Sequence, residues 1–185
     1  MIEKAKQAEL SEIIDVIENA RAFLKKQGLD QWQTSAYPAP ADILSDIKNG
    51  VGYVLKQDGE IVGYGAVITG VEPAYEQIQG QWLTQNDAYV TVHRLAISDK
   101  YRGKALGQQF FTAVFDMFAD YGDFRVDTHP DNQIMQHILT KLGFQACGIV
   151  LYESERIAFQ KVTRDDSQLK NGKENEVKRV EVYDG

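Results

Sequence analysis

A basic, glycine-containing turn separates an apolar strand-like segment from an apolar helical segment in the middle of the chain. The strand-like segment ends with Leu95, Ala96 and Ile97. The turn and the first helical residues are Arg102, Gly103, Lys104, Ala105, Leu106 and Gly107. Backbone amides at the start of a helix lack intrahelical acceptors and carry the positive end of the helix dipole, so a phosphate suits this position. The segment therefore predicts a phosphate site, and an ordinary basic surface loop is the alternative.

Two common phosphate-binding motifs do not match this turn. A dinucleotide fingerprint needs three glycines in the first strand–helix unit, and a P-loop needs Gly-Lys-Ser/Thr at the right spacing. The turn has neither pattern. No metal site is expected, because the three histidines lack metal-ligand spacing and one cysteine cannot build a cysteine-based zinc site.

The first half of the chain predicts two helices followed by strands. The apolar spacing and turn residues predict helices over 8–27 and 41–49 and strands over 52–57, 61–69 and 88–97. Asp58-Gly59 is a strong tight-turn pattern, so the first two strands are expected to form a hairpin. Residues 71–87 form a long polar connection, and a loop of that length inside a domain is often functional.

The second half alternates helices with strands. The expected elements are helices over 105–121 and 132–142 and strands over 124–128, 145–153 and 156–162. This alternation implies a partly parallel sheet that is covered by helices.

The composition is that of one globular domain with a polar extension. The 185 residues carry a net charge of −7, with 43% hydrophobic and 25% charged residues. We expect a domain over 1–163 and a polar, flexible tail over 164–185. The acidic balance argues against nucleic acid as a partner, and the short apolar runs argue against a membrane helix. The chain opens with an amphipathic pattern rather than a signal peptide, which predicts a cytoplasmic location.

Two motifs at the right separation give the chain a resemblance to a known family. The turn from Arg102 to Gly107 is similar to the Gln/Arg-x-x-Gly-x-Gly/Ala signature of the GNAT superfamily of acyl-CoA-dependent N-acyltransferases, with Ala105 in place of the first signature glycine. Downstream, Asn132 and the Gly143-Phe144 pair match the family's asparagine and the end of its helix. The resemblance implies an α/β (α+β) fold: a central mixed, mostly antiparallel sheet with splayed parallel central strands, flanked by helices.

The resemblance implies acetyl-CoA as the co-substrate and places its parts. The backbone of Leu95, Ala96 and Ile97 would face the acetyl carbonyl and the pantetheine arm, while Arg102, Gly103, Lys104, Ala105, Leu106 and Gly107 would hold the pyrophosphate. Asn132 would bond the pantetheine arm, and it is also a favoured helix N-cap, so both roles can coexist. We expect Ala105 to have a right-handed helical φ, where a methyl group is tolerated.

The sequence offers candidates for the groups that transfer protons. Many family members protonate the leaving thiolate with a tyrosine at the position where this chain has Leu139. His93 is the best candidate base, because it lies two residues before the acetyl-binding backbone, and a packed core histidine is the alternative. Tyr152 is a candidate acid or a residue of the acceptor pocket. Structural roles are favoured for His129, His137 and Cys147.

The acceptor side is expected between residues 30–37 and the loop 71–87. An aromatic wall there could contain Trp32, Tyr37, Tyr75 and Trp82. Glu72 and Glu76 could attract a cation. The alternative is that these aromatic residues anchor the loops on the core.

The leading hypothesis is a cytoplasmic N-acetyltransferase that moves acetyl from acetyl-CoA to a primary amine of a small molecule or peptide. The prediction includes no nucleic-acid or membrane partner and is compatible with a homodimer. One alternative is an acyl-CoA-binding regulatory module of the same fold without turnover, which Leu139 and Ala105 motivate. Another is a structural domain that acts through its surface or its tail.

Overall fold

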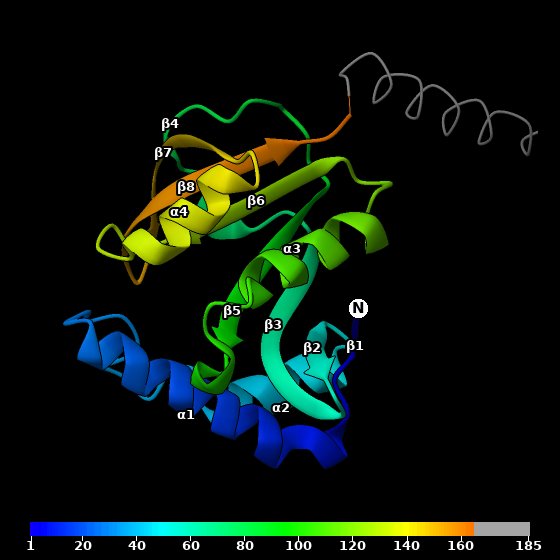
Figure 1. Cartoon of the computed structure of the whole chain (residues 1–185). Coiled ribbons are helices and arrows are strands. Elements are labelled where there is room, and N and C mark those ends of the chain that lie inside the picture. Colours follow the sequence, from blue (N-terminus) through cyan, green and yellow to red (C-terminus); the bar gives the residue numbers. More distant parts are fainter. Residues whose placement is uncertain (165–185) are drawn as a thin grey trace, which may run out of the picture.

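An eight-stranded mixed sheet runs through the computed structural model, which describes residues 1–164 (Figure 1). The strands are β1 (Ile2–Lys4), β2 (Gly52–Gln57), β3 (Glu60–Gly70), β4 (Gln79–Gly80), β5 (Tyr89–Ile97), β6 (Asp123–Thr128), β7 (Gln145–Tyr152) and β8 (Ser154–Val162). Their order is β1-β2-β3-β5-β6-β8-β7-β4, and every neighbouring pair is antiparallel except β5 and β6. This is the fold class that the resemblance implies. Apart from Arg164, the predicted polar tail lies outside the described residues.

Four helices cover the two faces of the sheet. They are α1 (Leu10–Lys26), α2 (Pro40–Lys48), α3 (Leu106–Met117) and α4 (Gln133–Lys141). The apolar stripe of α1 buries Ile13 and Ile17 with Ile43 of α2 against one face. The other face packs against α3 and α4, where Phe110 and Leu139 are fully buried. Figure 1 shows the α1–α2 layer and the α3–α4 layer on opposite sides of the strands.

Several element boundaries differ from the prediction for local reasons. Helix α3 ends at Met117 rather than at residue 121, and the turn that follows still packs Phe118 and Tyr121 against the core. The helical apolar spacing therefore continues past the end of the helix. Strands β1 and β4, which pair with β2 and β7, are too short to show an alternating pattern in the sequence.

The central strands touch at one end and then separate. The parallel pairing of β5 with β6 is limited to Val90 opposite Phe124 and Thr91 opposite Arg125. Figure 1 shows the two strands running apart beyond this shared end. The edge of β5 after Thr91 therefore has no β6 partner and borders a cavity.

A β-bulge lies in β5 at the start of this unpaired edge. Ala66 pairs with His93 and Tyr64 pairs with Ala96, so Arg94 and Leu95 stand opposite the single Gly65. Arg94 has a left-handed φ of 56°, which is uncommon for a residue with a side chain. Leu95, within the bulge, packs with the core under α3, and Ala96, which follows it, packs with the core under α1.

Candidate active site

A cavity of about 270 Å³ occupies the space where β5 and β6 separate. It reaches from the start of α3 to the β7–β8 turn and to the segment that joins α1 and α2. Its lining includes these residues that the sequence singled out: Trp32, Tyr37, His93, Leu95, Ala96, Ile97, Arg102, Gly103, Ala105, Leu106, Gly107, Asn132 and Tyr152. Lys104 is not among the lining residues; its side chain is exposed, with Nζ 5.0 Å from the Tyr101 ring centroid.

The start of α3 directs unused backbone amides toward this cavity. The first helical hydrogen bond runs from Gln109 N to Ala105 O at 3.0 Å, so the amides of Leu106, Gly107 and Gln108 precede the helical ladder. Gly103 has a φ of 81°, a conformation that favours glycine. This end of the cavity therefore suits an anion.

Ala105 corrects one expectation about this turn. It is the N-cap of α3 with a φ of 53° and a ψ of 33°, a left-handed conformation rather than the helical one expected from the sequence. A methyl group is strained in this conformation, whereas glycine is not. Alanine in place of the first signature glycine therefore strains the backbone at this position.

The Arg102 side chain is already engaged by its own turn and by α1. Its Nε is paired with the Asp99 carboxylate, and its guanidinium lies over the ring of Phe23. These contacts close the turn against α1. An anion at this end would therefore meet the backbone amides as well as the charge of Arg102.

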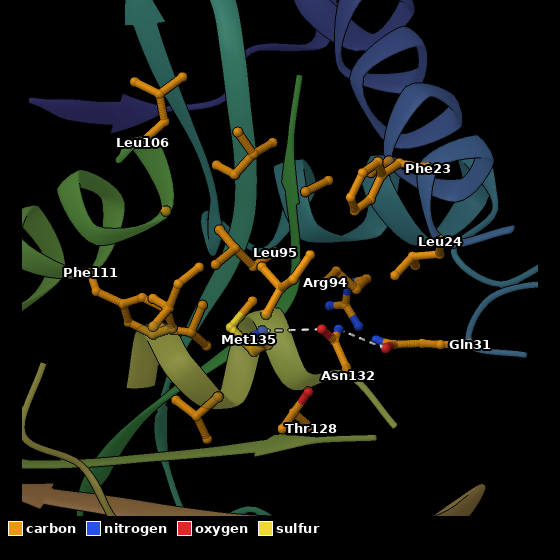
Figure 2. Close-up of a pocket in the computed structure, with 18 of the residues that line it drawn as sticks. Phe23, Leu24, Gln31, Arg94, Leu95, Leu106, Phe111, Thr128, Asn132 and Met135 are labelled. Atoms are coloured by element: carbon orange, nitrogen blue, oxygen red, sulfur yellow. Dashed lines mark hydrogen bonds between the residues drawn. The ribbon is translucent and has the colours of Figure 1, made fainter. Parts of the chain in front are cut away.

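Asn132 makes two side-chain hydrogen bonds at the centre of the cavity wall (Figure 2). Its Oδ1 accepts from the Met135 amide at 3.1 Å, which makes it the N-cap of α4. Its Nδ2 donates to Gln31 Oε1 at 3.0 Å. Figure 2 shows Gln31 reaching Asn132 from the side on which Phe23 and Leu24 lie, so this bond joins the α1–α2 segment to α4.

His93 is buried at 7% exposure and is held by Glu72. Its Nε2 lies 3.0 Å from Glu72 Oε2. The hydrogen bond from His93 lowers the pKa of Glu72 against the opposing effect of burial, so Glu72 is an ionised acceptor at neutral pH. This geometry assigns the proton of neutral His93 to Nε2 and leaves Nδ1 as a potential base.

Tyr152 lies against the other side of His93. The two rings stack with centroids 5.3 Å apart and an interplanar angle of 18°. Burial is the main cause that raises the Tyr152 pKa, so its hydroxyl stays protonated at neutral pH. Leu139, at the position of the common family tyrosine, is fully buried in the core. Tyr152 is thus a protonated tyrosine from another element that packs on the candidate base.

Arg94 also belongs to this cluster, and it was not among the site residues predicted from the sequence. Its Nε and Nη2 donate to both oxygens of Asp46, at 2.9 and 2.5 Å, and its Nη1 donates to the Tyr37 hydroxyl at 2.9 Å. An arginine inside a largely buried strand was the available clue. Its partner Asp46, on α2, could not be paired with it from sequence spacing.

Trp82 lies away from the cavity, which corrects its predicted place on the acceptor side. Its Nε1 donates to the Tyr75 carbonyl at 2.9 Å, and the Arg125 guanidinium lies over its ring at 4.6 Å from the centroid. Arg125 pairs with the fully buried Asp123, which also accepts from Thr84 Oγ1 at 2.6 Å. These contacts anchor the loop 71–87 on β6.

The remaining side chains named in the sequence analysis lie outside the cavity. Tyr75 is buried at 1% exposure and donates to Asp127 Oδ2 at 2.6 Å, while Glu76 is exposed. His129 Nδ1 accepts from the Asp131 amide, and His137 is exposed on α4. Cys147 is half-buried on β7 rather than fully buried, and its burial raises the pKa of its thiol.

Within residues 1–164, no group of three or more histidine, cysteine, aspartate and glutamate side chains is placed to hold a metal ion. None of the helices in the described part of the chain is long and apolar enough to cross a membrane.

Comparisons with known proteins agree with this architecture. Residues 14–144 match the model of the acetyltransferase (GNAT) family. A GNAT-family acetyltransferase structure from Streptococcus agalactiae 2603 is 44% identical, with a TM-score of 0.85 over 89% of this chain and 96% of that chain. The comparison with curated proteins gave no match.

More distant structures share the fold. A putative acetyltransferase from Staphylococcus aureus Mu50 is 24% identical, with a TM-score of 0.68 over 89% of this chain and 99% of that one. The ribosomal-protein-S18-alanine N-acetyltransferase from Escherichia coli is 12% identical, with a TM-score of 0.59 over 89% and 95%. The family match and the 44% identical structure decide the assignment: the chain belongs to the GNAT family and is an acetyltransferase.

Proposed function

We propose that this enzyme transfers an acetyl group from acetyl-CoA directly to a primary amine of a small molecule or peptide. One observation carries the proposal: a single cavity joins the anion-binding start of α3 to the His93 cluster at the point where β5 and β6 separate. A long, anionic thioester and an amine could meet there. The alternative of a binding module without turnover has no such support, because membership in the family makes the chain an acyltransferase.

The residues along the cavity fit the successive parts of acetyl-CoA. The amides at Leu106, Gly107 and Gln108 suit the pyrophosphate. Asn132 presents an amide group to the pantetheine arm, and the unpaired edge of β5 from Val92 to Ile97 offers backbone groups to the thioester end. No group in this arrangement needs a metal ion.

Direct transfer needs a neutral amine and a protonated leaving group. The amine nitrogen would attack the thioester carbonyl carbon, and the bond between that carbon and the CoA sulfur would break. His93 Nδ1 would take the proton that the amine loses, while Glu72 holds Nε2. Tyr152 would give a proton to the departing thiolate, since its hydroxyl stays protonated and its ring packs on His93.

An amine panel with a free-thiol readout tests this proposal. We expect release of CoA that depends on the amine, with one acetylated amine formed for each CoA. His93→Gln should lower kcat by roughly a hundredfold or more while acetyl-CoA still binds. Amine-independent release, or an unchanged rate and pH profile in His93→Gln, would contradict the assigned role. The homodimer, the domain boundary at residue 163 and the cytoplasmic location remain predictions.

A further inference from the structure

Arg156 lines the cavity, and its guanidinium makes few polar contacts with the described residues. Its side chain is only 11% exposed, and it lines the same cavity as His93 and Tyr152. Its Nε donates to Ser154 Oγ at 3.3 Å. Its nearest carboxylate oxygen is Asp127 Oδ1, 4.0 Å from Nη1 and beyond hydrogen-bond distance. The Nη hydrogens of Arg156 therefore lack a hydrogen-bond acceptor among residues 1–164.

Arg94 differs from Arg156 in this respect. The Arg94 guanidinium uses Nε and Nη2 on Asp46 and Nη1 on the Tyr37 hydroxyl. Its charge is matched by a buried carboxylate, and each of its three nitrogens already donates a hydrogen bond. Arg156 differs because neither of its Nη atoms makes a hydrogen bond within residues 1–164, which leaves both free for an acceptor molecule.

The carboxylates near this end of the cavity are already engaged. Glu72 is bound to His93, and Asp127 Oδ2 accepts from the Tyr75 hydroxyl. The Asp127 side chain is only 6% exposed. Each of these two carboxylates therefore already faces a partner: Glu72 faces His93, and Asp127 faces Tyr75 and Arg156.

Arg156 lies on the acceptor face of the sheet. Arg156 pairs opposite Val150 in the β7–β8 hairpin, whose turn is bounded by Tyr152 and Ser154. The next inward residue on the same face of β8, Ala158, packs with Tyr75 and Tyr89, whereas Ile157 packs with the core under α3 and α4. Arg156 therefore shares its face with the Tyr75 and His93 side chains and not with the α3 end of the cavity.

We propose that the acceptor amine carries a carboxylate and that Arg156 binds it. This inference rests on the proposed function, since it names the substrate class of that same site. A planar guanidinium with parallel N–H groups matches a carboxylate in a bidentate pair. A single negative charge suits the position better than a phosphate dianion, because Asp127 already lies 4.0 Å from Arg156. The acceptors would be amino acids or compounds with an amine and a carboxylate on a short spacer.

Binding of product-like probes tests the inference without turnover. The probes are N-acetylglycine, N-acetyl-L-phenylalanine and 4-acetamidobutyrate, each compared with its primary amide by calorimetry on the CoA-bound protein. We expect at least one acid to bind about tenfold or more tightly than its amide, the size of a charge-assisted hydrogen bond. Arg156→Gln should remove this preference, and Arg156→Lys should reduce it, because lysine lacks the planar fork.

Two controls separate this inference from folding defects and from the proposed function. Arg164→Gln removes a positive charge at an exposed pair with Asp120 and should keep the preference. CoA binding by the Arg156 variants checks that they fold. Equal binding of all three acids and amides, no binding of any acid, or a preference that persists in Arg156→Gln would overturn the inference. An acid preference in a protein that acetylates no amine would overturn the proposed function and leave the Arg156 site standing.

Discussion

Glu72 Oε2 lies 3.0 Å from His93 Nε2, so a residue just after β3 orients a side chain in the middle of β5. Glu72 would act as a positioning residue: its carboxylate selects the tautomer and the ring orientation of the candidate base. The contact also gives a reason for the anchored loop 71–87, since a displaced loop would release His93.

Removing the Glu72 carboxylate should slow the reaction without weakening acetyl-CoA binding. We expect Glu72→Ala to lower kcat by about tenfold or more, and by less than His93→Gln, because the base remains but loses its orientation. Steady-state kinetics with a separate Kd for acetyl-CoA measure this difference. Glu76→Ala is the matched control, since Glu76 is exposed in the same loop. A loss of acetyl-CoA affinity equal to the loss of rate would show that Glu72 is structural.

The Glu72 titration should depend on His93. The hydrogen bond from His93 lowers the Glu72 pKa from its ordinary value of 4.5, while burial raises it. Replacing His93 by Phe removes the first effect and keeps the second, so the carboxyl pKa should rise above that of the wild type. Carbon NMR of the Glu72 carboxyl group measures this directly. Because the folded-state pKa is lowered, the stabilisation by ionised Glu72 is present above about pH 5 and is lost as the pH falls through the folded-state value. An unchanged Glu72 pKa in the variant would contradict the assigned contact.

Two substitutions of Asn132 should distinguish its role as a helix cap from its predicted role in binding the cofactor. Asn132→Asp keeps an oxygen that accepts from the Met135 amide but removes the Nδ2 donor. We expect this variant to retain stability and to bind acetyl-CoA more weakly. Asn132→Ala should also lose about 1 kcal/mol of unfolding free energy, because the cap is gone. Urea unfolding and calorimetry measure the two effects, and equal acetyl-CoA affinities of wild type and Asn132→Asp would exclude the pantetheine role.

Ala105→Gly should stabilise the protein. The φ of 53° at Ala105 is strained for a residue with a methyl group, and glycine removes the strain at some cost in unfolded-state entropy. The expected gain is about 0.5–1 kcal/mol in urea unfolding. Gly103→Ala, at a φ of 81°, should change stability in the opposite direction. A lower stability of Ala105→Gly would mean that the turn does not hold this conformation.

Sequence alone predicted the strand–turn–helix unit, because its apolar periods and its glycines are local properties. It also predicted most of the cavity lining around Arg102 and Asn132 through the resemblance. The conformation of Ala105 was predicted wrongly, since its φ is set by how the turn packs and not by its residue type. The pairing of Arg94 with Asp46 joins residues 48 positions apart, and such contacts leave no periodic pattern in the sequence. The place of Trp82 was decided by Arg125, a partner on another strand.

Calorimetry of acetyl-CoA tests the central claim, that the cavity between β5 and β6 holds the thioester. The wild-type protein should bind at one site, and a concentration of 100 times the Kd should add about 2.7 kcal/mol to the unfolding free energy. Gln108→Glu should weaken this binding while the fold is kept, because its partly exposed carboxylate would repel the pyrophosphate yet suits the first turn of α3. Absence of binding to the folded wild-type protein at millimolar acetyl-CoA, or undiminished binding by Gln108→Glu, would contradict the account.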